Sequence, residues 1–235
     1  MRIHDLSMPI TGDHFRWPAP RAVTGDHSDA RPFQVTRIDI SCHSFTHVDA
    51  RRHMLADGET IENTPLTEVA GPCFIADLHD LTPGEEVTQA RLEAALEGHS
   101  GEPIILMRSA WDRQRDWRSE AYWRDAPYMS REASRALAAR APKAVAFDFP
   151  QDYTIRLSLD GICPPITEHV THDEILRRGI TLIEYLIGAS AIPGPRTFLC
   201  ALPLKIEGAD GAPARVVAID GLLEQPLSTQ PGGRP

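Results

Sequence analysis

Residues 43–53 decide how this sequence is interpreted. They read His43-Ser44-Phe45-Thr46-His47-Val48-Asp49-Ala50-Arg51-Arg52-His53, so three histidines and one aspartate share a single short segment. Imidazole nitrogen and carboxylate oxygen together suit Zn²⁺ or Mn²⁺, and a ligand set without thiolate is typical of an ion left open to water. The cluster therefore predicts a divalent-metal site, although single histidines are more often ordinary surface or core residues.

The cluster cannot be a simple extended strand. At about 3.3 Å per residue, extended backbone would put His43 and Asp49 about 20 Å apart, whereas the ligands of one ion each lie about 2 Å from it. The chain must therefore curl here, and small or polar residues such as Ser44 and Thr46 permit this. We reserve His53 for proton transfer, because an imidazole with an ordinary pKa of about 6.5 can act as a base near pH 7.

The segments before the cluster suggest an arm followed by a strand. Residues 8–32 are rich in Pro, Gly, Asp and His, which predicts a long irregular loop. From Phe33 the chain alternates, with apolar Val35, Ile38 and Ile40 set against polar Arg37, Asp39 and Ser41, as in a half-buried strand that leads into His43. The histidine cluster is thus expected to begin at the end of a strand.

The segments after the cluster predict a mixed α and β order. Two helices are expected, over residues 88–97 and, with an N-cap serine, over residues 130–140. Short apolar runs flanked by turn residues predict further strands over residues 74–78, 103–107, 144–147, 197–202 and 215–219.

A second, weaker constellation follows. Residues 171–174, Thr-His-Asp-Glu, resemble a capping box that opens a short helix ending before Gly179. This would put His172 at a helix N-terminus, where the dipole disfavours imidazolium and leaves the ring available as a ligand. Glu184 lies alone in the apolar run 180–187. A buried carboxylate is costly unless it is paired or bound to metal, but Glu184 pointing outward is an equally good interpretation at this point.

Composition limits the classes of partner. A chain of 235 residues with 42% hydrophobic content can bury one substantial core, so we expect one domain over residues 1–235, with an N-terminal arm (1–32) and a flexible tail (226–235). Its 24 basic and 33 acidic side chains give a formal charge of −9, which opposes binding to nucleic acid or anionic lipid. The partner expected is a small-molecule substrate.

The sequence also predicts a cytoplasmic location. The first residues lack the apolar region of a signal peptide, and no run approaches the roughly 20 apolar residues needed to span a membrane. The four cysteines lie far apart without a C-x-x-C pair, which predicts neither a disulfide framework nor a thiolate zinc site.

The cluster resembles the signature H-x-G-T-H-x-D-A-P-x-H of the cyclase-like metal-dependent hydrolases, a family that includes bacterial kynurenine formamidase and isatin hydrolase. Every polar member of that signature is present in residues 43–53. The resemblance extends to Asp5-Leu6-Ser7, Asp57-Gly58, Gly71-Pro72 and residues 201–208, and His172 and Glu184 fall at the family's later ligand positions.

The resemblance implies a fold, a site and an activity. The fold is α/β, a swivelling β/β/α domain with a central mixed sheet, usually as a homodimer or homotetramer. His43, His47 and Asp49 would bind a first ion, and His172 with Glu184 would complete a site for two zinc ions or one manganese. His53 would be the general base in hydrolysis of a small amide, formamide or lactam.

Two positions depart from the signature. Phe45 replaces its glycine and could narrow the substrate pocket or stack on a planar substrate, while Arg51 replaces its proline and could pair with a substrate carboxylate or remain a solvated charge. Phe15 and Trp17 of the arm are also candidate pocket residues, although ordinary loop packing explains them equally well.

Three other functions stay open at this point. A lactonase or a dehydrating cyclase would use the same metal on another carbonyl compound. A non-catalytic ligand sensor is the alternative from a different class, and Phe45 crowding the ion would support it.

Overall fold

The frame of the protein is one large curled sheet. The structure, a computed structural model, describes residues 1–18, 21–25, 27–28 and 30–222, so the expected tail (226–235) lies outside the described residues. Within these residues the nine-stranded sheet has the order β1-β13-β11-β5-β7-β9-β10-β4-β12. Its strands are β1 (Arg2–Asp5), β4 (His47–Asp49), β5 (Ala70–Asp77), β7 (Ile104–Arg108), β9 (Ala144–Phe147), β10 (Thr181–Glu184), β11 (Arg196–Cys200), β12 (Gly211–Pro213) and β13 (Val217–Asp220).

The sheet is mixed. Strands β5, β7, β9 and β10 run parallel to their neighbours in that group, while the pairs at both sides of it are antiparallel. The parallel strands are mostly apolar because both of their faces are covered, although β5, β7 and β10 end in Asp77, Arg108 and Glu184. This confirms the predicted α/β class with a central mixed sheet.

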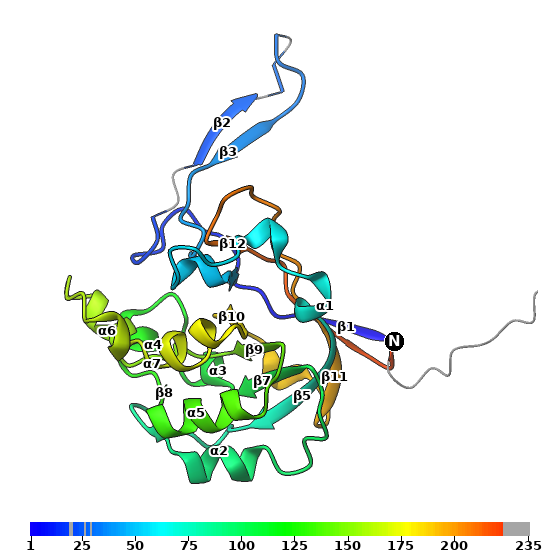
Figure 1. Ribbon diagram of the computed structural model, residues 1–235. Coiled ribbons are helices and arrows are strands. Elements are labelled where there is room, and N and C mark those ends of the chain that lie inside the picture. The colour runs from blue at the N-terminus through cyan, green and yellow to red at the C-terminus, as the bar shows by residue number, and fades with distance from the viewer. Residues whose placement is uncertain (19–20, 26, 29, 223–235) are drawn as a thin grey trace, which may run out of the picture.

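Alternate residues of the parallel strands enter two separate cores. Phe74 and Ile105 face a cluster that includes the helical residue Leu137, and Figure 1 shows helices α2 and α5 along this side. Ile75 joins a second cluster on the other face. Val48 near one end of the sheet order also belongs to this second cluster, together with residues of β11 and β13, so the sheet curls around it.

The helices are short and lie between strands. Those predicted over 88–97 and 130–140 are confirmed as α2 and α5, and the Thr88 and Ser130 side chains cap them. The α-helices are α1 (Leu66–Val69), α2 (Gln89–Ala95), α3 (Trp111–Gln114), α4 (Glu120–Arg124), α5 (Arg131–Ala139), α6 (Thr154–Ser158) and α7 (Val170–Glu174). The 3-10 turns are η1 (Arg51–His53), η2 (Ile61–Asn63), η3 (Ile166–Glu168), η4 (Leu176–Arg178) and η5 (Ala189–Ala191), and two short strands, β6 (Glu86–Val87) and β8 (Tyr128–Met129), pair with each other.

The segment before the histidine cluster differs from expectation. Strand β3 (Val35–Ile38) is exposed along its whole length and pairs with β2 (Arg21–Gly25) in a separate hairpin, which projects from the body in Figure 1. The predicted half-buried strand leading into His43 is therefore wrong over Val35–Ile38, where every side chain is exposed among the described residues. Residues 2–5, within the expected N-terminal arm (1–32), pair with β13 in the main sheet.

The other predicted strands are confirmed with small shifts in their ends. Residues 144–147 match β9, and the runs at 74–78, 103–107, 197–202 and 215–219 correspond to β5, β7, β11 and β13. Among the described residues, no helix is both long and apolar enough to cross a membrane.

Candidate metal centre

The central residues of the candidate site, His47 and Asp49, lie on strand β4 of the curled sheet. His47 and Asp49 are two residues apart, so they share one face of this strand, and both are buried. The antiparallel register with β10 sets Glu184 directly opposite His47. The distance from His47 Nε2 to Glu184 Oε2 is 3.6 Å, and to Asp49 Oδ1 it is 3.2 Å. Glu184 is 2% exposed, so it does not point outward.

His43 joins from the turn that precedes β4. Its Nδ1 lies 2.8 Å from Asp49 Oδ1, and its Nε2 lies 2.9 Å from Asp210 Oδ2. Asp210 stands just before β12, whose residue Gly211 pairs with Asp49. A Cβ on Gly211 would come within 2.8 Å of the His43 ring, so only glycine leaves room for that imidazole.

The opposite side of the site is built by helix α7. His172 Nε2 lies 3.4 Å from Glu184 Oε1 and 3.6 Å from Asp49 Oδ2. Its Nδ1 lies 2.7 Å from Asp152 Oδ2, and the other oxygen of Asp152 accepts the Thr171 backbone N–H at 2.7 Å. Asp152 thereby orients the ring and leaves Nε2 directed at the two carboxylates.

The predicted capping box at residues 171–174 is wrong. Helix α7 begins one residue earlier, and its N-cap position has no side-chain hydrogen bond. Glu174 instead accepts hydrogen bonds from three arginines, Arg131, Arg135 and Arg178. The Thr171 hydroxyl accepts from Gln151 rather than capping the helix. His172 lies inside the first turn, where Asp152 from another part of the chain holds it.

The donor set fits a divalent cation. Asp49 Oδ2 is buried and has no hydrogen-bond partner in the described part of the chain, which is costly for a carboxylate oxygen unless something else binds it. His47 donates its Nδ1–H to the Phe45 carbonyl at 2.8 Å, so its Nε2 presents a lone pair. Asp49 belongs to two groups of candidate ligands. One consists of His43, His47 and Asp49, and the other of Asp49, His172 and Glu184. Within each group, the ligand atoms all lie within 4.8 Å of one another.

The charges of the cluster favour a cation. Burial lowers the pKa of His172, but Glu184, Asp152 and Asp49 outweigh it and raise that pKa to about 10. Burial likewise lowers the pKa of His43, and hydrogen bonds and charge from Asp49 and Asp210 raise it to about 9. The neighbouring histidines hold the pKa of Asp49 well below its usual range despite its complete burial. The carboxylates of the cluster therefore stabilise positive charge among the buried candidate ligands.

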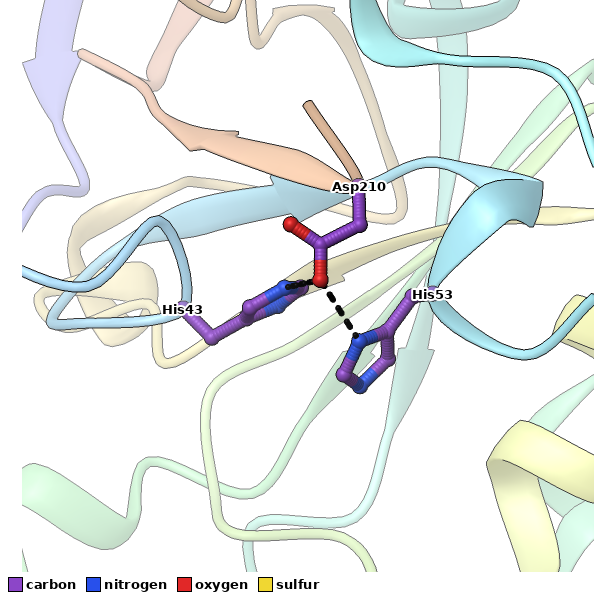
Figure 2. A group of neighbouring side chains, drawn as sticks. All are labelled: His43, His53 and Asp210. Atoms are coloured by element: carbon purple, nitrogen blue, oxygen red, sulfur yellow. Dashed lines mark hydrogen bonds and ion pairs between the residues drawn. The ribbon is translucent and has the colours of Figure 1, made fainter. Parts of the chain in front are cut away.

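His53 differs from the other histidines in its surroundings. Its side chain is 31% exposed, and its ring lies 3.9 Å from that of His43, centroid to centroid. Figure 2 shows Asp210 between these two rings, 3.4 Å from His53 Nδ1. Burial, together with the neighbouring His43 and His172, lowers the pKa of His53 against the opposing pull of Asp49 and Glu184. The ring is therefore neutral at pH 7 and able to accept a proton.

A cavity of about 290 Å³ opens onto the cluster. Its lining includes His43, His47, His53, His172, Glu184, Tyr185, Trp17 and Arg16. A larger cavity of about 440 Å³ lies elsewhere, by Met8 and Leu204, and no histidine is among its described lining residues.

Of the four candidate pocket residues, only Trp17 lines the cavity that opens onto the cluster. Phe15 lines only a neighbouring hollow. Phe45 is completely buried and packs in the core against Trp17 and Trp117, so its ring is not part of the cavity wall. Arg51 is held by Glu59 and by the Gly179 carbonyl, each at 2.9 Å or less, and is likewise not in the wall.

Sequence reasoning missed several residues at the site, among them Asp152, Asp210 and Tyr185. Asp210 precedes the short run Gly211–Pro213, which is too short to show a strand period. Asp152 is 20 residues from His172 in sequence and lies close to it only in the folded structure. The pair Asp210-Gly211, two residues beyond the resembling stretch 201–208, was the one usable signal, and it indicates a turn as readily as a site.

Comparison with known proteins agrees with this geometry. Residues 4–151 match the family model described as "Putative cyclase". Kynurenine formamidase of Salinibacter ruber is 28% identical over 229 residues, covering 94% of this chain and 98% of that protein. Among solved structures, a "predicted metal-dependent hydrolase from Bacillus stearothermophilus" is 26% identical with a TM-score of 0.68, covering 92% of this chain and 97% of that one. Isatin hydrolase A from Labrenzia aggregata shares the fold with a TM-score of 0.75 at 21% identity, covering 92% and 93%. The chain therefore belongs to the cyclase-like hydrolase family.

Proposed function

We propose that this protein is a metal-dependent hydrolase of a small formamide, amide or lactam, as the names of its relatives suggest. The observation that supports this best is Asp49, a buried carboxylate with one unpartnered oxygen between two sets of candidate ligands. In this proposal His43, His47 and Asp49 hold one ion, and Asp49, His172 and Glu184 hold a second. Nitrogen and carboxylate ligands suit two Zn²⁺ ions, or one Mn²⁺ in a mononuclear form.

A bound divalent cation supplies two things here: it acidifies water and polarises the substrate carbonyl. The chain's own residues supply the proton transfers. Asp210 accepts the Nδ1–H of His53, which leaves Nε2 of that ring to take a proton from the attacking water. The water oxygen bonds to the carbonyl carbon, the C–N bond breaks, and His53 returns the proton to the leaving nitrogen. Trp17, in the cavity wall, suits a planar substrate.

The first experiment combines metal analysis with a substrate screen. Protein purified without added ions is analysed for metal, and formanilides, isatin-type lactams and lactones are then assayed with each metal restored. Release of formate or amine supports the proposal. Lactone opening alone would instead identify a lactonase.

The role of His53 is tested by substitution. His53→Ala is expected to lower kcat at least 100-fold, since general acid–base catalysis contributes about 10²–10⁴-fold, while metal content stays near that of the wild type. Loss of metal from this variant would make His53 a ligand. Asp49→Asn is the matched control, because it is expected to lose metal and activity together.

We also propose that the chain is a single domain that assembles as a homodimer or homotetramer. The hairpin of β2 and β3 exposes Phe33 (63%), Val35 (45%) and Ile38 (48%), an apolar surface that a second copy would cover. Val35→Asp with Ile38→Asp is expected to shift the mass measured by light scattering to that of a monomer. An unchanged mass would contradict this role. The four free cysteines suit a reducing, cytoplasmic location, which localisation of a tagged chain tests.

A further inference from the structure

Arg16 is the cationic side chain of the cavity that the proposed reaction leaves unused. Among the described residues that line this cavity, it is the one arginine, and no lysine is present. It also lines the neighbouring hollow with Phe15 and Ser158, so it stands where the two spaces adjoin. Arg16 is therefore placed to meet a ligand that enters toward the metal ligands.

The guanidinium is held in position by aromatic rings and not by a counter-ion. Its Cζ lies 4.6 Å from the ring centroid of Trp123, 5.0 Å from that of Trp17 and 5.7 Å from that of Tyr185. These cation–π contacts orient the planar group without using its N–H donors. Within the described part of the chain, no carboxylate forms an ion pair with it.

One donor of this group has no partner. Arg16 Nη1 is buried, and it has no hydrogen-bond partner among the residues that the structure describes. A buried charged donor left unpaired is destabilising, so a partner that arrives with the substrate would relieve the cost. An arginine fork matches a carboxylate in shape, because two parallel N–H groups can meet its two oxygens.

We propose that Arg16 is an anion subsite that selects aromatic amides carrying a carboxylate on the ring. The proposal rests on the proposed hydrolase function. In it, the amide carbonyl faces the metal ligands, the aromatic ring lies beside Trp17, and the carboxylate meets the guanidinium. Arg16 acts on substrate affinity and orientation and moves no proton.

The test compares two probes that differ by one carboxylate, 2-formamidobenzoate and formanilide. Wild-type protein is expected to prefer the carboxylated probe in kcat/KM. Arg16→Met is expected to lower kcat/KM for 2-formamidobenzoate about 10- to 100-fold, mostly through KM, because a charged hydrogen bond is lost. Its effect on formanilide is expected to stay within about twofold. Equal losses on both probes would overturn the proposal and make Arg16 a packing residue.

Two further variants control for structure. Arg118 stacks on Trp117 with its Cζ at 4.2 Å but does not line the cavity, so Arg118→Met should leave the ratio between the two probes unchanged. Arg16→Lys keeps the charge without the fork and should lower that ratio by a smaller factor than Arg16→Met. If Arg16→Met fails to fold, a lysine variant with the wild-type ratio overturns the proposal.

A binding measurement separates this proposal from the hydrolase function. If wild-type protein hydrolyses neither probe, the proposed function fails for these substrates, and calorimetric binding of 2-aminobenzoate to the zinc-loaded protein decides the subsite. Binding that is at least tenfold weaker in Arg16→Met supports the anion subsite. Equal binding by both proteins, with aniline as the neutral comparison, overturns it.

Discussion

Phe45 offers the sharpest test of how this chain departs from the family signature. Its backbone has φ = 56°, in the left-handed region, which explains why the signature carries glycine at this position. A left-handed conformation costs a residue with a Cβ about 1–2 kcal/mol. The ring compensates by packing: Phe45 is 0% exposed, with ring contacts to Trp17, Trp117 and His14.

The prediction compares Phe45→Ala with Phe45→Gly. Phe45→Ala loses the ring and keeps the strained backbone, so unfolding should cost about 3–5 kcal/mol less than in the wild type. Phe45→Gly loses the ring and also the strain, so its loss should be about 1 kcal/mol smaller. The Phe45→Gly variant should therefore be more stable than the Phe45→Ala variant, the reverse of the usual order in strands and helices.

Phe74 is the matched control for this pair. It is a buried phenylalanine (2% exposed) in the middle of strand β5, outside the left-handed region. Phe74→Gly should therefore be less stable than Phe74→Ala by about 0.5–1 kcal/mol. Urea unfolding of metal-free protein, followed by tryptophan fluorescence, measures all four variants on one scale. If the glycine variant is less stable than the alanine variant at both positions, the backbone at Phe45 is not strained and the reasoning is refuted.

Three further predictions concern the site and its surroundings. Gly211→Ala should weaken zinc binding about 10-fold or more in a chelator competition assay, because its Cβ would displace the His43 ring; Gly71→Ala, whose Cβ would meet only an ordinary contact at 3.5 Å, should not. Burial raises the pKa of Glu174, but hydrogen bonds from three arginines lower it to about 2 from 4.5. Its ionised form thus stabilises the fold at pH above about 4.5, and this stabilisation is lost as the pH falls toward 2. Glu174→Gln should therefore lower the free energy of unfolding by about 1–2 kcal/mol at pH 7. In urea unfolding experiments, this free energy should also fall less steeply with decreasing pH in the variant than in the wild type. Saturating zinc should raise the free energy of unfolding by about 2.7 kcal/mol at 100 times Kd, and Asp49→Asn should abolish that gain in a thermal shift assay.

Strands and helices in the interior of the fold could be predicted from the sequence because each is marked by its own residues. The run Ala144–Phe147 is apolar throughout and lies between turn residues, and it forms β9 without any change of bounds. Ser130 caps α5 as its position predicts. Both signals concern residues within one element, so no knowledge of distant contacts was needed.

The hairpin shows where such local reasoning stops. The apolar pattern from Val35 does reflect a strand, but it says nothing about what covers that strand, and among the described residues β3 stays exposed. The same limit applies to Asp152. Its carboxylate orients His172 from 20 residues away, and no spacing rule connects a loop aspartate with a helix histidine.

The site depends on register more than on any single motif. Glu184 lies opposite His47, and Gly211 opposite Asp49, only because β10 and β12 pair with the two edges of β4. A slip of one residue would turn Glu184 to the other face of the sheet and out of reach of His47. The short motif at 43–53 therefore supplies the ligands nearest one another in sequence, while strand β10 supplies Glu184 and helix α7 supplies His172. For this reason metal affinity should respond to substitutions that disturb β4 pairing, such as Gly211→Ala, even though they remove no ligand.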